Sequence, residues 1–180
     1  MRRRGALGQP QTANFLVTGV LYSGLAVALQ HPGPAPTGSR LRAKLIGAAA
    51  AGLLGAGIFL TDPISGYPPG TPEASPGYSG TAAALHDLLS IPTFLGLPAA
   101  AAVYGRAFAR QGRRGWALYS AGTAAAMLTA VGLAGAAFSQ APRLVANGGL
   151  YQRASVTIGF TWLTALALQA RRNLKRPGSR

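Results

Sequence analysis

All three acidic residues of this 180-residue chain, Asp62, Glu73 and Asp87, lie in one short stretch, and His86 stands beside the last of them. A histidine with two or three carboxylates can bind a divalent metal ion that activates water. Without a metal, an aspartate can orient the histidine so that the pair acts as acid and base. Because charge is costly inside or against a membrane, an apolar chain keeps acids only where neighbours hold them. The clustering therefore predicts one polar site on the molecule.

The predicted site combines acid, base and hydrogen-bonding side chains from the end of one helix, the start of the next and the loop between them. Its candidate ligand-binding residues are Asp62, Tyr67, Glu73, His86, Asp87 and Ser90. Asp62, His86 and Asp87 are also the candidates for catalysis and for metal binding. His86 and Ser90 share a helix face one turn apart, whereas Asp87 points about 100° away from His86. The two adjacent residues are therefore expected to differ in their partners.

Two features of this cluster weigh against enzymatic chemistry. The sequence has no His-x-Glu or His-Glu-x-x-His pair and no Gly-x-Ser-x-Gly turn. Its other histidine, His31, is expected on the opposite side of the membrane. A structural role explains the same residues: Asp62 can cap a helix end, Asp87 suits a helix N-terminus, and His86 can bond Asp62 or a loop carbonyl. Both interpretations remain open at the level of sequence.

The composition places this site on a membrane protein. Hydrophobic residues make up 49% of the chain and charged residues 11%, against roughly 25% charged in an average soluble protein. Several apolar runs reach or approach the ~20 residues that cross a bilayer, and they contain Ala and Gly where a soluble bundle needs polar faces. The net charge of +14 comes from basic clusters beside these runs, which indicates membrane topology and not nucleic-acid binding. The absence of cysteine excludes disulfides, zinc-thiolate sites and thiol nucleophiles.

The apolar runs predict an all-α, polytopic transmembrane helical bundle that forms a single integral membrane domain, residues 1–180. The five expected spans are at about 13–29, 45–60, 82–104, 116–138 and 154–170. The Pro/Gly-rich loop of residues 61–81 carries five prolines and is not expected to form a helix. Pro92 and Pro98 lie inside the third span, where they can kink it.

The basic residues predict how the chain is oriented in the cell membrane. They cluster in residues 30–44, 105–115 and the tail 171–180, which all fall on one side of a five-span chain. Since basic loops favour the cytoplasm, the C-terminus is expected inside and the 61–81 loop outside. Five spans then require an outside N-terminus, which the arginines at 2–4 contradict. A signal peptide is the competing interpretation of the first span, although Ala28-Leu29-Gln30 forms a poor cleavage site.

The segment Asp62–Pro72, which reads Asp-Pro-Ile-Ser-Gly-Tyr-Pro-Pro-Gly-Thr-Pro, is distinctive in its setting between Gly57-Ile58-Phe59-Leu60-Thr61 and Leu85-His86. Together with Gln11-Thr12-Ala13-Asn14-Phe15 and Arg114-Gly115-Trp116-Ala117-Leu118-Tyr119-Ser120, it resembles the bacterial membrane-protein family called domain of unknown function 998. The resemblance runs from about Gln9 to the fifth span. It implies that family members have six helices and that this chain begins at the position of their second helix. With one more helix in front, both termini would lie inside. It implies no reaction, cofactor or catalytic residue.

The sequence favours a non-catalytic binding or scaffold module whose outer-face pocket takes a small ligand or a lipid head group. One alternative is a membrane-embedded hydrolase, with or without a metal, that uses the His/Asp cluster. The other is a component of a small-solute or lipid transporter, built on two hydroxyl stripes that would form a polar seam. These stripes are Thr157, Thr161 and Thr164 on the fifth span, and Asn14, Thr18 and Tyr22 on the first. The lipid bilayer is the expected partner, nucleic acid is not expected, and the sequence specifies neither a cofactor nor an oligomeric state.

Overall fold

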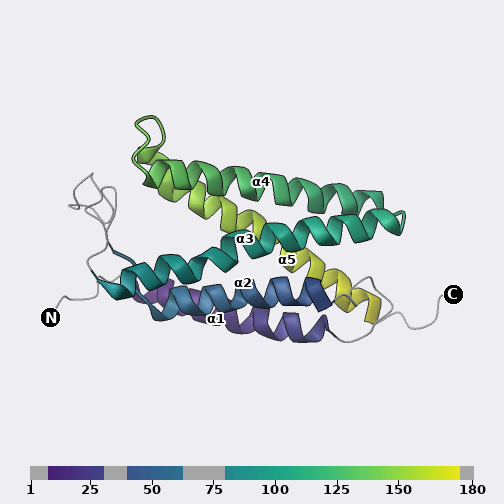
Figure 1. Cartoon of the computed structure of the whole chain (residues 1–180). Coiled ribbons are helices and arrows are strands. Elements are labelled where there is room, and N and C mark those ends of the chain that lie inside the picture. Colours follow the sequence, from purple (N-terminus) through teal and green to yellow (C-terminus); the bar gives the residue numbers. More distant parts are fainter. Residues whose placement is uncertain (1–7, 31–39, 63–79, 175–180) are drawn as a thin grey trace.

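The computed structural model describes residues 8–30, 40–62 and 80–174, which form five α-helices and one short 3-10 helix (Figure 1). The elements are α1 Gly8–Ala28, α2 Arg40–Ile58, α3 Thr81–Arg110, α4 Arg114–Phe138, η1 Val145–Asn147 and α5 Gly148–Leu174. The described residues contain no strand. The prediction of an all-α bundle of five helices is confirmed.

Three of the helices, α2, α3 and α4, are long and apolar enough to cross a membrane. The helices α1 and α5 have comparable lengths, 21 and 27 residues, but they carry more polar residues. α1 opens on Gly-Gln-Pro-Gln-Thr, and α5 contains Gln152, Arg153 and Gln169. Helices also extend past several predicted spans, because backbone hydrogen bonding does not stop where the apolar run stops: α5 begins at Gly148 and includes residues 171–174 of the predicted tail.

Each helix packs mainly on its neighbours in the sequence, α1 on α2, α2 on α3, α3 on α4 and α4 on α5. In Figure 1, α1 and α2 form one layer and α4 lies on the opposite side, with α3 between them and α5 crossing behind. α3 changes direction along its length and contains Pro92 and Pro98. Each proline removes a backbone donor and crowds the preceding turn, so the two residues bend the helix without ending it.

The contact between α2 and α3 is close because α2 presents glycines to α3. A Cβ added at Gly52 would lie 2.5 Å from Thr93 Oγ1 and 2.9 Å from the carbonyl oxygen of Leu89. The Thr93 hydroxyl donates to the carbonyl of Ala49 across this interface at 2.9 Å, and Thr93 is buried. Small residues that let backbones approach are the usual way in which membrane helices associate. Gly52 therefore contributes to packing within the chain.

An aromatic cluster fills the space between α3, α4 and α5. Trp162 is fully buried, and its Nε1 donates to Ser120 Oγ at 3.0 Å. The ring of Trp162 packs edge-on against Tyr104, with centroids 5.6 Å apart, and Tyr104 is followed one turn later by Phe108. The indole N–H has a partner inside the apolar core, which a buried polar group requires.

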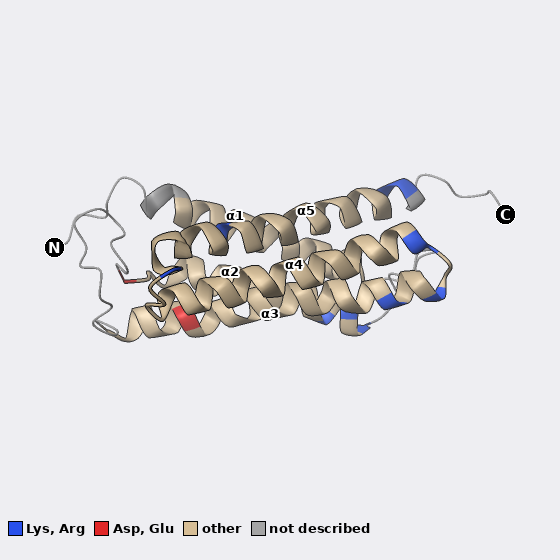
Figure 2. Cartoon of the chain, turned by 90° about the horizontal axis from the view of Figure 1, so that it is seen from above, with Lys and Arg blue, Asp and Glu red and all other residues tan. Residues whose placement is uncertain are grey.

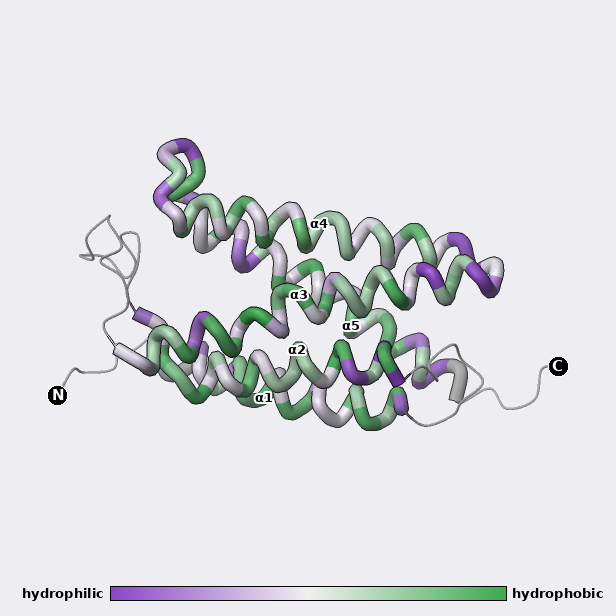
Figure 3. The backbone as a smooth tube through the Cα atoms, in the orientation of Figure 1, coloured by the Kyte–Doolittle hydropathy of each residue, from purple (hydrophilic) through white to green (hydrophobic). Residues whose placement is uncertain are grey.

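Charge is divided between the two ends of the bundle. The described acids, Asp62 and Asp87, lie at the end where α2 finishes and α3 begins, which we call the acidic end (Figure 2). Arg143 and Arg153 are also at this end. The opposite end, called the basic end, carries Arg40, Arg42, Lys44, Arg106, Arg110, Arg113, Arg114, Arg171 and Arg172. Between the ends, the helices are mostly hydrophobic (Figure 3).

Candidate functional site

His86 joins the start of α3 to the end of α2. The side chain is half-buried, and its Nδ1 lies 2.8 Å from the carbonyl oxygen of Phe59. Because a carbonyl can only accept, Nδ1 is the donor in this bond. Phe59 follows Ile58, the last residue of α2, and the final carbonyls of a helix have no partner within it. The histidine therefore satisfies a helix-end carbonyl, which is one of the alternatives that the sequence offered.

The other predicted site residues differ in their exposure and in their hydrogen bonds. Asp87 is exposed. Ser90 donates its hydroxyl to the backbone carbonyl of His86 at 2.7 Å, so this bond does not involve the imidazole. Asp62 is half-buried just beyond the end of α2. Tyr67 and Glu73 lie outside the described residues.

The chemistry open to the described part of this cluster is limited. No group of three or more His, Cys, Asp or Glu residues is placed to hold a metal ion within residues 8–30, 40–62 and 80–174. With Nδ1 engaged by Phe59, Nε2 is the nitrogen of His86 that can accept a proton or bind a ligand. The arrangement thus supplies one acceptor nitrogen, Nε2, which suits hydrogen bonding to a ligand.

The two hydroxyl stripes of the transporter alternative meet at one point. Tyr22 of α1 forms a side-chain hydrogen bond with Thr164 of α5, and its ring packs edge-on against Phe160 with centroids 5.2 Å apart. Thr157 and Thr161 are exposed on α5. The stripes thus contribute to contact between the first and last helices.

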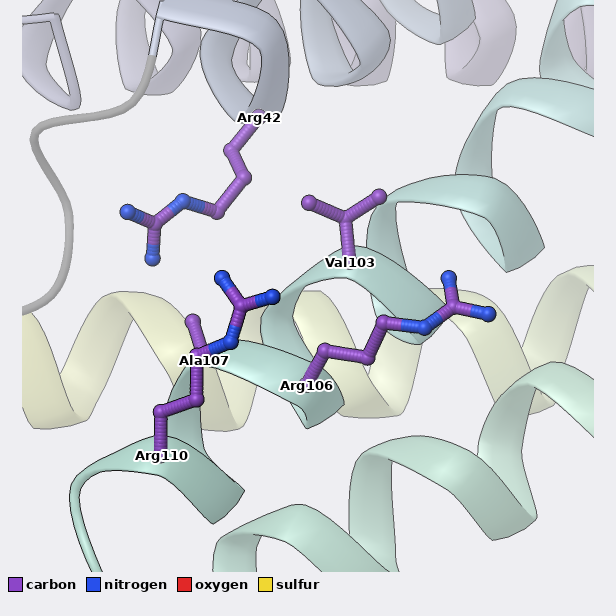
Figure 4. Close-up of a pocket in the computed structure, with 5 residues that line it drawn as sticks. All are labelled: Arg42, Val103, Arg106, Ala107 and Arg110. Atoms are coloured by element: carbon purple, nitrogen blue, oxygen red, sulfur yellow. The ribbon is translucent and has the colours of Figure 1, made fainter.

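A second candidate site is a pocket at the basic end, which the sequence analysis did not identify (Figure 4). Its volume is about 240 Å³, and it is lined by Arg42, Val103, Arg106, Ala107 and Arg110. Arg42 comes from the first turn of α2, and the other four come from the last turns of α3. In the sequence these arginines indicated membrane topology alone. The feature of the sequence that could have pointed to this pocket was the spacing of Arg106 and Arg110, which places them one turn apart on one helix face.

Arg42 is the most enclosed cation of this pocket. The residue is 9% exposed, and its guanidinium carbon lies 5.0 Å from the centre of the Tyr104 ring, a cation–π contact. Its Nη1 is buried and has no hydrogen-bond partner among the described residues. In Figure 4 the guanidinium groups of Arg42 and Arg110 extend toward each other, and Arg106 extends to the other side of Val103.

The chain matches a family model described as "Protein of unknown function (DUF998)" over residues 3–169. The chain belongs to the DUF998 family. The resemblance seen in the segments around Asp62, Gln11 and Arg114 is thereby confirmed over most of the chain. No curated protein and no solved structure matches it. The DUF998 description assigns no activity.

Proposed function

We propose that this DUF998 protein is a non-catalytic, multi-pass module of the cell membrane, with its basic end in the cytoplasm and its acidic end outside. The observation that carries the proposal is the concentration of basic residues at one end of an apolar bundle, where nine of the eleven described lysines and arginines lie. Basic residues next to membrane spans favour the cytoplasmic side. The three helices that are long and apolar enough to span, α2, α3 and α4, run between these ends.

The outer surface of the bundle supports the same environment for α1 and α5. Large apolar side chains are exposed on all five helices, including Val20 and Leu21 on α1, Ile91 and Leu95 on α3, and Leu118 on α4; Leu150 and Leu168 are the corresponding residues of α5. Exposed apolar area of this extent is costly in water and is favourable against lipid tails. A bilayer that α2, α3 and α4 cross would therefore also surround α1 and α5.

The orientation is tested by labelling single cysteines, since the natural chain has none. Ser139 and Gln111 are both exposed and lie at opposite ends of α4. In intact cells, Ser139→Cys should react with a membrane-impermeant maleimide, and Gln111→Cys should react after the cells are broken. Labelling of Gln111→Cys in intact cells, with protection of Ser139→Cys, would reverse the proposed orientation.

At the acidic end, the module is proposed to bind a small ligand or a lipid head group through Asp62, Tyr67, Glu73, His86, Asp87 and Ser90. The bond from His86 Nδ1 to Phe59 fixes the ring and leaves Nε2 as an acceptor that a ligand can use. The same bond would also orient a general base or a metal ligand, but no group of three or more His, Cys, Asp or Glu side chains is placed to hold a metal among the described residues.

We expect the purified protein to contain no stoichiometric metal, and we expect His86→Asn to remain as stable as the wild type. The Asn amide can donate to Phe59 as Nδ1 does, whereas His86→Ala removes the donor and should lower the unfolding free energy by about 1 kcal/mol. Metal content and thermal unfolding in detergent measure the two effects. Near-stoichiometric metal that disappears in Asp62→Asn and His86→Asn would instead establish a metal-dependent hydrolase as the better hypothesis.

A further inference from the structure

We propose that the pocket formed by Arg42, Arg106 and Arg110 at the basic end binds a phosphate group, either as the head group of an anionic lipid or as the free ion. The proposal rests on the membrane insertion proposed above, but it does not depend on which end faces the cytoplasm. It concerns residues separate from the His86 cluster at the acidic end.

Arg42 brings a nearly buried charge to the pocket. A guanidinium stays charged in proteins and presents its N–H donors in the plane of the group. The Tyr104 ring, 5.0 Å from the guanidinium carbon, covers one face of that plane and accepts none of the in-plane hydrogen bonds. Nη1 is therefore left without a partner in the described part of the chain while the residue is only 9% exposed. A phosphate oxygen is the acceptor that matches such a planar fork.

An excess of positive charge surrounds the pocket, which three arginines line. Arg106 and Arg110 are one turn apart on α3, where two cations repel each other. Arg42 lies in the first turn of α2, which has no acid, and the helix dipole disfavours cations at that end. The described acids are at the far end of the bundle. A bound anion would offset both repulsions from within the pocket.

The size and the position of the pocket also suit a phosphate group. Its volume of about 240 Å³ far exceeds the ~10–15 Å³ that one water molecule needs, so a phosphate group has room. The pocket lies between the beginning of α2 and the end of α3, where the spanning helices reach the head-group layer of a bilayer. Val103 and Ala107 give one wall apolar character, which suits the upper acyl chains of a lipid. Basic pockets between membrane helices bind phosphate head groups in this way.

The test compares two variants that lose the same charge at the same end of the molecule. Arg106→Gln/Arg110→Gln removes two pocket cations that are exposed, so the fold should persist. Arg114→Gln/Arg172→Gln removes two exposed cations outside the pocket. Each protein is placed in nanodiscs of mixed phosphatidylcholine and phosphatidylglycerol, and native mass spectrometry measures which lipid stays bound. A second series uses nanodiscs of phosphatidylcholine alone, with inorganic phosphate or chloride at equal ionic strength, and records thermal unfolding by circular dichroism.

For a lipid head group, the wild type should retain phosphatidylglycerol in preference to phosphatidylcholine. The pocket variant should lose about tenfold or more of that preference, and the control variant less than about twofold. If the free ion is the ligand, inorganic phosphate should raise the unfolding midpoint of the wild type and the control variant, but not of the pocket variant. Equal losses in the two variants, or no preference for either anion in the wild type, would overturn the proposal. Failure of the wild type to enter nanodiscs would count against the proposed membrane function instead.

Discussion

Gly52→Ala is expected to lower the unfolding free energy by about 1–3 kcal/mol, the usual cost of an added group in a filled contact. The new Cβ would lie 2.5 Å from Thr93 Oγ1, 2.9 Å from the carbonyl oxygen of Leu89 and 3.0 Å from the backbone nitrogen of Thr93. Neither neighbour can move easily. The Leu89 oxygen belongs to the backbone of α3, and Thr93 is fixed by its hydrogen bond to Ala49. The two helices must therefore separate, and the Thr93 bond should weaken with them.

The matched control is Gly122→Ala on α4. A Cβ there meets no heavy atom of the described residues within 4 Å, and the position is exposed. Because alanine is favoured over glycine inside a helix by roughly 0.5–1 kcal/mol, this variant should be slightly more stable than the wild type. Thermal unfolding followed by circular dichroism in detergent micelles measures both. Equal behaviour of the two variants would mean that α2 and α3 do not approach as closely as described.

Trp162→Ala is expected to cost about 3–5 kcal/mol, as for other buried tryptophans. Trp162 is fully buried between α3, α4 and α5, and its removal would leave Tyr104 without its edge contact. Lipid tails are as apolar as the protein core, so most of this cost in a membrane comes from the cavity and the lost packing contacts. The value should therefore fall near the lower end of the range.

Two further variants separate the causes of the Trp162 effect. Ser120→Ala leaves the indole N–H without its acceptor and should cost about 1–3 kcal/mol. Trp116→Ala removes a half-buried ring and should cost less than Trp162→Ala. Unfolding in bilayers or mild detergent, measured for all three variants, should show a larger loss of unfolding free energy for Trp162→Ala than for the other two. A larger loss for Trp116→Ala would show that the centre of the aromatic cluster has been misplaced.

The helices were predictable because each apolar run is long and is separated from the next by Pro, Gly or basic residues. Their ends were less predictable. α5 starts at Gly148, well before the apolar run, because Tyr151, Gln152 and Arg153 can continue a helix outside a membrane. α3 passes through Pro92 and Pro98 because neighbouring turns keep the helix intact around the missing donors.

The two candidate sites show which side-chain partners a sequence of this kind cannot reveal. His86 and Asp62 were placed together because they flank the same loop, but the bond from His86 to Phe59 uses a backbone carbonyl, which has no residue signature. The pocket around Arg42 depends on how α2 and α3 are rotated about their axes. A helix that is apolar on every side, as in a lipid environment, gives no periodic pattern from which that rotation can be inferred.

The packing of each helix on its neighbours in the sequence has a consequence for biosynthesis. Contacts between consecutive helices require little loop closure, so α1 to α4 can associate in the order in which the ribosome delivers them. α5 arrives last and brings Phe160 to Tyr22 of α1 and Trp162 to Tyr104 of α3. A nascent chain that stops before α5 therefore lacks the ring contacts that Phe160 and Trp162 make with Tyr22 and Tyr104.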